Sequence, residues 1–146
     1  MTYSPRTFGK VGAKQEEQEA LVNDHGSLML KATPVRITSL GKLERIDVSD
    51  ETQMDAIAGV LKTDLNNGEA GSIIGAGLLE NITSGASFGD VLWVSKSGDL
   101  TNIKPSIGVN GFLAGDFVIR IGVVSKNLAN PSNKDLLINI SITGQL

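Results

Sequence analysis

The sequence predicts a mainly β protein, a compact sandwich or barrel-like domain of about seven to nine short strands with an extended N-terminal arm. Three observations predict this class. Glycine accounts for 17 of the 146 residues, well above the roughly 7% of an average protein. Hydrophobic residues make up 40% of the chain but aromatic ones only 4%, so the core must be aliphatic. Short aliphatic runs also recur at roughly ten-residue spacing, with turn residues between them.

The arm is assigned to residues 1–27 and the β domain to residues 28–146. Apolar residues are sparse in the arm, and a charged run over 14–19 suggests at most one helical turn near residues 15–22. Two interpretations of the arm stay open. It is either a disordered terminus or a segment that becomes ordered only on a partner subunit.

Alternating and continuous aliphatic patterns mark the strands of the β domain. Leu28, Leu30 and Ala32 alternate with polar residues up to Pro34, which places this strand at an edge or a break. Asp50, followed by Gln53 three residues later, predicts a short helix that ends before Gly59. The predicted strands lie over 28–32, 35–37, 42–48, 59–61, 72–79, 91–95, 117–124 and 136–142. The predicted turns and loops lie over 66–68, 85–90, 96–99, 100–115 and 127–134.

One internal similarity suggests a duplicated β unit. Residues 59–67 (GVLKTDLNN) align with residues 122–130 (GVVSKNLAN), and an aliphatic run follows each copy after a turn. The matching residues are common ones, so chance agreement remains the alternative.

Charge and composition exclude several classes of protein. The net charge is −3, whereas a general nucleic-acid binder carries a basic surplus, so we expect no nucleic-acid partner. The absence of cysteine removes disulfides, thiolate metal sites and thiol nucleophiles. No apolar stretch approaches the roughly 20 residues of a membrane span, and the N-terminus shows no secretory signal. We therefore expect no membrane association and synthesis in a cytoplasm.

The sequence offers little for catalysis, and we expect the protein not to be an enzyme. His25 is the single histidine, it lies in a polar turn, and no Gly-x-Ser-x-Gly motif accompanies it. The acidic residues Asp47, Asp50, Glu51 and Asp55 lack the spacing of a calcium loop and fit the first turn of a helix better. Gly75 and Gly77 lack the third glycine of a dinucleotide loop. No cofactor and no metal ion are expected.

The second half of the chain resembles small structural proteins of tailed bacteriophages. The resemblance rests on residues 87–101 (SFGDVLWVSKSGDLT), on Pro105, and on residues 115–124 (GDFVIRIGVV). Capsid decoration, or cement, proteins and head-fibre proteins show this order of glycine–aspartate, aromatic strand, glycine turn, proline loop and valine-rich strand. Residues 57–60 are similar to an earlier step of the same pattern.

The resemblance implies a capsid decoration subunit on the virion surface, assembled in the host cytoplasm, that binds the major capsid protein. It also implies a homo-oligomer, with a trimer favoured. The expected contact residues for capsid or subunit are Tyr3, Arg6, Phe8, Trp93 and Phe112, together with the glycine-rich loop 105–115. The arm residues have an alternative role, which is to fold back on the chain's own core. Trp93 is expected to anchor either the core or a subunit contact. Two alternative functions stay open: a tail, baseplate or fibre-anchoring module of the virion, and a carbohydrate-binding or hydrolytic domain.

Overall fold

The computed structural model describes residues 16–146, and these form nine strands and one short 3₁₀ helix. The strands are β1 (Glu16–Val22), β2 (Pro34–Ile37), β3 (Leu43–Arg45), β4 (Ile57–Leu61), β5 (Ala70–Ile82), β6 (Val91–Val94), β7 (Leu100–Thr101), β8 (Phe117–Lys126) and β9 (Lys134–Gln145), and the helix is η2 (Glu51–Ala56). This mainly β architecture confirms the predicted fold class.

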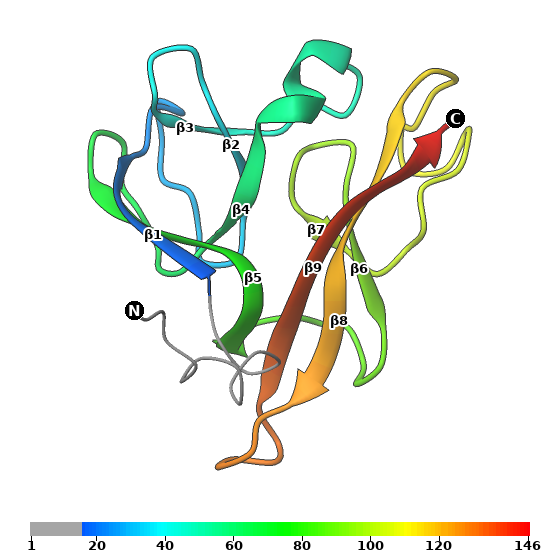
Figure 1. Cartoon of the computed structure of the whole chain (residues 1–146). Helices are drawn as coiled ribbons and strands as arrows, with labels where there is room; N and C mark the ends of the chain where they lie inside the picture. Colours follow the sequence, from blue (N-terminus) through cyan, green and yellow to red (C-terminus); the bar gives the residue numbers. More distant parts are fainter. Residues whose placement is uncertain (1–15) are drawn as a thin grey trace, which may run out of the picture.

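The nine strands form one continuous sheet that does not close on itself. Its order is β3-β2-β4-β5-β9-β8-β6-β7, with β1 paired to β5 outside this path, and all the named strands pair antiparallel. Strand β5 is long enough to serve both halves. Ile73 and Ile74 pair with β4 on one edge and with β1 on the other, while the part from Ala76 onward pairs with β9. Figure 1 shows the two resulting lobes, β1–β5 on one side and β6–β9 on the other.

Two hydrophobic clusters fill the fold. The larger lies between the lobes and includes Val60 and Ile74 from the first half and Leu92, Val124 and Leu136 from the second. The smaller cluster lies on the other face of the first lobe, and its members are Met29, Val35, Leu43, Leu61, Leu65 and Ile73. Successive strand residues point to opposite faces. The pairs Val60-Leu61 and Ile73-Ile74 therefore read as unbroken apolar runs because each residue enters a different cluster.

The structure supports the duplication that the sequence suggested, because the two halves share the same strand register. A shift of 57 residues carries the β2–β3 pairing onto β6–β7, and a shift of 63 residues carries β4–β5 onto β8–β9. The equivalent pairs are Arg36–Glu44 and Trp93–Thr101, Ile37–Leu43 and Val94–Leu100, Val60–Ile74 and Val123–Leu137, and Leu61–Ile73 and Val124–Leu136. A register irregularity also falls at the same place in the β2–β4 and β6–β8 pairings.

The turns and close contacts repeat as well. The Thr38 N–H donates to the Lys42 carbonyl at 2.8 Å, and the equivalent Ser95 N–H donates to the Asp99 carbonyl at 2.7 Å. A side chain on Gly59 would place its Cβ closer than 3.0 Å to the Ile74 carbonyl oxygen, and one on Gly122 would meet the Leu137 carbonyl oxygen in the same way. The matched glycines thus mark equivalent backbone contacts. We infer that the domain consists of two copies of one four-stranded unit.

The structure corrects two of the predicted elements. Residues 16–22 form strand β1 rather than part of a helical turn, so the sheet begins inside the segment assigned to the arm. Residues 28–32 do not form a strand. Met29 is buried while Leu28 and Leu30 are exposed, the reverse of the predicted alternation, and Ala32 has a positive φ that turns the chain into β2.

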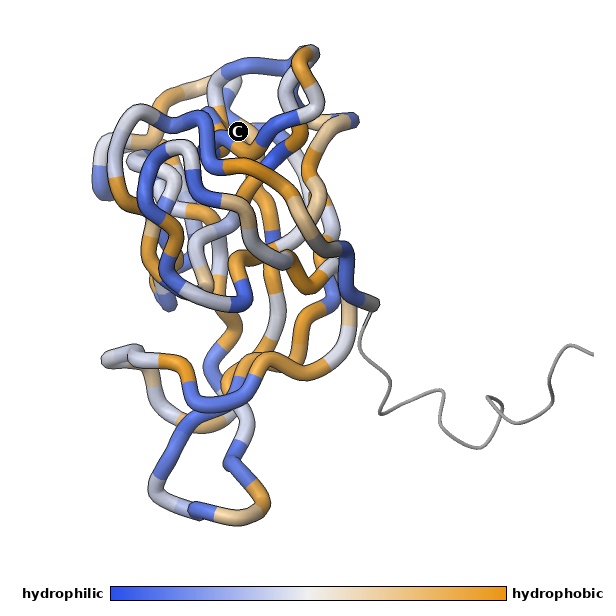
Figure 2. The backbone as a smooth tube through the Cα atoms, turned by 90° about the vertical axis from the view of Figure 1, so that its left-hand side faces the viewer, coloured by the Kyte–Doolittle hydropathy of each residue, from blue (hydrophilic) through white to orange (hydrophobic). Residues whose placement is uncertain are grey.

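Other predicted elements are confirmed, with boundaries that move by a few residues. The Asp50 side chain accepts a hydrogen bond from the Thr52 N–H at 3.0 Å, so it caps η2 as expected. The strands predicted over 72–79 and 136–142 extend to become β5 and β9. The β8–β9 hairpin projects from the rest of the chain, and its tip is mostly hydrophilic (Figure 2).

Candidate interaction surfaces

The structure separates the residues predicted to form contacts. Tyr3, Arg6 and Phe8 lie outside the described residues. Trp93 lies mid-strand in β6 and is half-buried, with the Lys104 Nζ 5.6 Å from its ring centroid. Phe112 is 2% exposed and belongs to the larger core cluster, which corrects its prediction as a contact residue. Phe112 therefore anchors the glycine-rich loop to the core.

Phe112 fixes the loop that joins β7 to β8. The Gly108 N–H donates to the Phe112 carbonyl at 2.9 Å, and the Phe112 N–H donates to the Val109 carbonyl at 3.1 Å. At the end of the loop, the Gly115 N–H donates to the Leu146 carbonyl and the Leu146 N–H donates to the Asp116 carbonyl. The loop therefore has a defined shape and lies beside the C-terminal end of the chain (Figure 1).

The buried carboxylate of Asp116 closes this loop. It accepts hydrogen bonds from the Lys96 Nζ at 2.7 Å and from the Leu113 N–H at 2.8 Å. Burial by itself opposes ionisation of the carboxyl, but these two hydrogen bonds and the charge of Lys96 outweigh it and lower the pKa of Asp116. The ionised aspartate thus ties the loop to the β6–β7 turn, where Lys96 lies.

The same loop exposes four aliphatic side chains, which we call the loop patch: Ile103, Ile107, Val109 and Leu113. Ile107 is 61% exposed and Leu113 is 62% exposed. Ile103 and Val109 line a small hollow together with Pro105. Apolar side chains held by a rigid loop cost little entropy to bury against a partner. The loop patch is therefore the best candidate for a contact surface among the described residues.

Comparison of the two repeats supports this assignment. The connection that carries the loop patch is the part of the second repeat that differs most from the first. The numbering offset between equivalent residues of the two repeats is 57 before this connection and 63 after it. The connection is therefore six residues longer than its counterpart in the first repeat. The counterpart in the first repeat contains η2, which has the polar sequence ETQMDA and a single buried residue, Met54. The second copy thus carries an aliphatic loop where the first has a polar helix.

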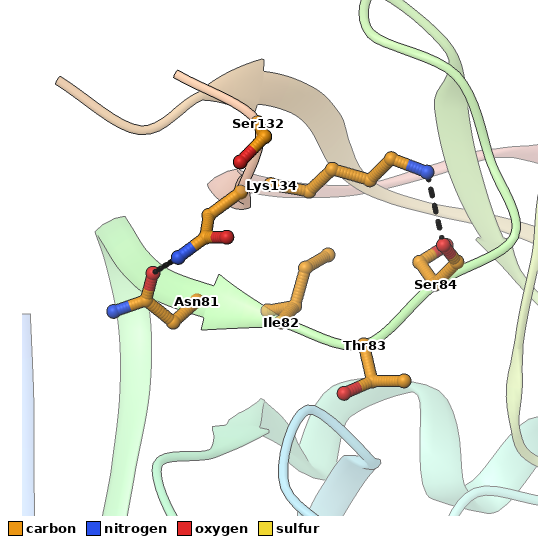
Figure 3. A pocket seen from close by; sticks show the side chains of 7 residues that line it. Asn81, Ile82, Thr83, Ser84, Ser132 and Lys134 are labelled. Atoms are coloured by element: carbon orange, nitrogen blue, oxygen red, sulfur yellow. Dashed lines mark hydrogen bonds between the residues drawn. The ribbon is translucent and has the colours of Figure 1, made fainter. Parts of the chain in front are cut away.

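An open hollow at the ends of β5 and β9 is lined mainly by small polar side chains (Figure 3). The Asn133 Nδ2 donates to the Asn81 Oδ1 at 3.1 Å, and the Lys134 Nζ donates to the Ser84 carbonyl at 3.0 Å. Among residues 16–146, Lys134 is the one charged residue that lines it, and its ammonium is engaged by that carbonyl. These contacts join two segments of the chain and explain the arrangement without a ligand.

His25 lies in a second hollow, lined also by Arg36, Arg45 and Lys96. Its Nδ1 pairs with the Glu44 carboxylate. The Arg45 guanidinium pairs with Asp99 at 2.5 Å. The hydrogen bonds found within residues 16–146 include none between a serine or threonine hydroxyl and the His25 ring. These polar contacts join the N-terminal segment, β3 and the β6–β7 turn.

The acidic residues near η2 cap backbone groups. The Ser49 hydroxyl and N–H both donate to Asp47, and these bonds lower the pKa of Asp47. The Thr52 hydroxyl and N–H do the same for Asp50 and lower its pKa. Over the described range, residues 16–146, no group of three or more histidine, aspartate or glutamate side chains is arranged to hold a metal ion.

No family model matches the chain, and no curated protein matches it either. Within the described part of the chain, no helix has the length and apolar character needed to cross a membrane.

Proposed function

We propose that this chain is a virion structural protein, a capsid decoration subunit that binds and stabilises the major capsid lattice through protein–protein contacts. The observation that carries the proposal is the loop patch: exposed Ile103, Ile107, Val109 and Leu113 on a loop fixed by Phe112 and Asp116. A decoration protein needs a rigid module with an apolar contact surface and no reacting groups. The phage-like sequence pattern of residues 87–124 contains this loop and is the reason for choosing a capsid over other partners.

The proposal includes a homo-oligomer, with a trimer favoured. Rotational symmetry repeats one modest contact surface several times on a symmetric lattice and so raises the overall affinity. The arm residues Tyr3, Arg6 and Phe8 are proposed to add contacts of their own to the shell or to a neighbouring subunit.

The test is co-sedimentation of the purified protein with capsid shells that lack it. Ile107→Asp combined with Leu113→Asp is expected to abolish binding, because both side chains are exposed and the charges oppose burial. Leu128→Asp is the matched control, since Leu128 is 97% exposed at the tip of the β8–β9 hairpin. Deletion of residues 1–12 is expected to leave the β domain soluble and to abolish assembly onto shells. Undiminished binding by the loop double variant contradicts the proposal.

Labelling the protein on intact particles separates the alternatives. A label on the tail or baseplate favours the tail module, and a label over the capsid surface favours decoration. Binding in a glycan array, lost on Trp93→Ala, favours the carbohydrate-binding domain instead.

A further inference from the structure

The outer side of the second repeat carries an apolar row, flanked by the polar residues Arg120, Asn139 and Ser141. Leu92, Val94, Val124, Leu136 and Ile138 point into the core, so their strand neighbours point outward. Cross-strand pairing aligns Val91 with Val123 and Val123 with Leu137 in one row. Trp93 and Arg120 pair in a second row. We call this surface the open face: Val91, Trp93, Arg120, Val123 and Leu137.

The row of the first repeat that corresponds to Val91, Val123 and Leu137 is buried. Ile74 corresponds to Leu137 and Val60 corresponds to Val123 under the shift of 63 residues. Ile74 and Val60 are 0% exposed and pack in the larger cluster against the inner side of the second repeat. Leu137, by contrast, is 46% exposed. The same row is therefore buried by a β-sheet in one repeat and partly exposed in the other.

The two repeats stack in one direction. The side of the first repeat that corresponds to the open face packs against the core side of the second repeat. The opposite side of the first repeat is covered by Leu21, Met29 and Leu65. A stacked array ends in a cap that covers its last apolar face. At the first repeat, Met29 and its neighbours form this cap. At the second repeat, the described residues leave the row of Val91, Val123 and Leu137 as the terminal face.

We propose that a second copy of this chain covers the open face. In the first repeat, the equivalent face is covered by an aliphatic sheet surface. Among the described residues, the aliphatic sheet surface that remains exposed is the open face, so we expect the open face of a second copy to cover it. Charge is compatible with this contact, because the row of Val91, Val123 and Leu137 is uncharged. This inference rests on the proposed homo-oligomer and names one surface at which two of its copies meet.

The test measures the mass of the full chain in solution by sedimentation equilibrium, without shells. The wild-type protein is expected to have a multiple of the 15.3 kDa chain mass. Val123→Glu with Leu137→Glu is expected to weaken the dissociation constant about a hundredfold or more and to yield monomers, since two charges enter an apolar contact. Leu128→Glu is the matched control and keeps the wild-type mass. Circular dichroism establishes that each variant is folded.

Three outcomes overturn the inference. The first is a monomeric wild-type protein at its highest soluble concentration, and the second is an unchanged mass in a folded double variant. The third is a monomeric protein whose β8 and β9 amides lose protection from hydrogen exchange when residues 1–15 are removed. In that case the segment that covers the open face belongs to the same chain. Shell binding is measured separately, so a failure of this contact is distinguishable from a failure of the capsid proposal.

Discussion

At the scale of single residues, Asp116 helps to hold the loop patch in place. Its carboxylate is nearly inaccessible to solvent and has two donors, the Lys96 ammonium and the Leu113 N–H. The neighbouring Leu113 is one of the most exposed aliphatic residues of the described chain. Ionisation of one buried side chain therefore supports the position of an exposed contact residue.

The lowered pKa of Asp116 predicts a specific acid sensitivity. Because the folded-state pKa lies below the unfolded value of about 3.9, ionised Asp116 stabilises the fold above that pH. This contribution is lost as the pH falls below about 3.9 and through the folded pKa. Asp116→Asn is expected to cost about 1.5–3 kcal/mol at neutral pH, from the lost charge-assisted bonds, and to flatten the pH dependence in that window.

Urea denaturation at a series of pH values measures both effects. Asp55→Asn is the control, because Asp55 is exposed on η2, and it is expected to change the free energy of unfolding by less than about 0.5 kcal/mol. The assignment is contradicted if the free energy of unfolding of the Asp116→Asn protein changes between pH 2 and pH 4 as steeply as that of the wild type, whatever its stability at neutral pH.

At the scale of elements, the repeated hairpin depends on glycine where two backbones approach closely. Gly59 in β4 and Gly122 in β8 occupy equivalent positions, and at each one a Cβ would meet a carbonyl oxygen of the next strand. That oxygen belongs to the backbone and cannot move aside as the end of a side chain can. A steric requirement explains why these glycines recur in the two halves.

Gly122→Ala is therefore expected to destabilise the fold by about 1–3 kcal/mol, the usual cost of overpacking. Gly144→Ala is the matched control in the neighbouring strand β9, since nothing lies within 4 Å of a Cβ at Gly144. The control is expected to be neutral within about 0.5 kcal/mol. Urea midpoints of the two variants measure the difference, and equal midpoints contradict the close contact.

At the scale of the whole molecule, two similar halves acquire different surroundings because they stack in one direction. Each repeat has aliphatic residues on both faces of its sheet. The contact between the repeats covers one face of the first repeat and one face of the second. The N-terminal segment covers one remaining face with Met29 and Leu21. Equivalent residues in the two repeats therefore contribute unequally to stability.

The pair Ile74 and Leu137 tests this inequality. Ile74→Ala is expected to cost about 2–5 kcal/mol because it leaves a cavity in the core. Leu137→Ala is expected to cost less than about 1 kcal/mol, because the half-exposed side chain leaves no closed cavity. Denaturation is measured at high dilution, where copies of the chain are apart. Equal losses contradict the stacking of the repeats.

Much of the fold was predictable from local sequence. Short aliphatic runs bounded by glycine, asparagine and aspartate predicted β4, β5, β6, β8 and β9, because strand alternation and turn chemistry act over a few residues. Asp50 as a helix cap follows from the same local rules. The similarity between residues 59–67 and 122–130 also pointed to the duplicated unit before any pairing was visible. The loop over 105–115 was expected to be a contact segment because of the resemblance to phage structural proteins, and that expectation stays a prediction.

Local sequence did not determine which apolar residues are covered. Phe112 is an anchor in the core while Ile107 and Leu113 are exposed, and nothing in the adjoining residues separates the three. Leu28 and Leu30 alternate as strand residues do, yet Met29 between them is the buried one. Composition and periodicity determined that this chain forms an aliphatic β domain. Tertiary structure decided which sheet faces are buried, because burial depends on packing partners that are remote in the sequence.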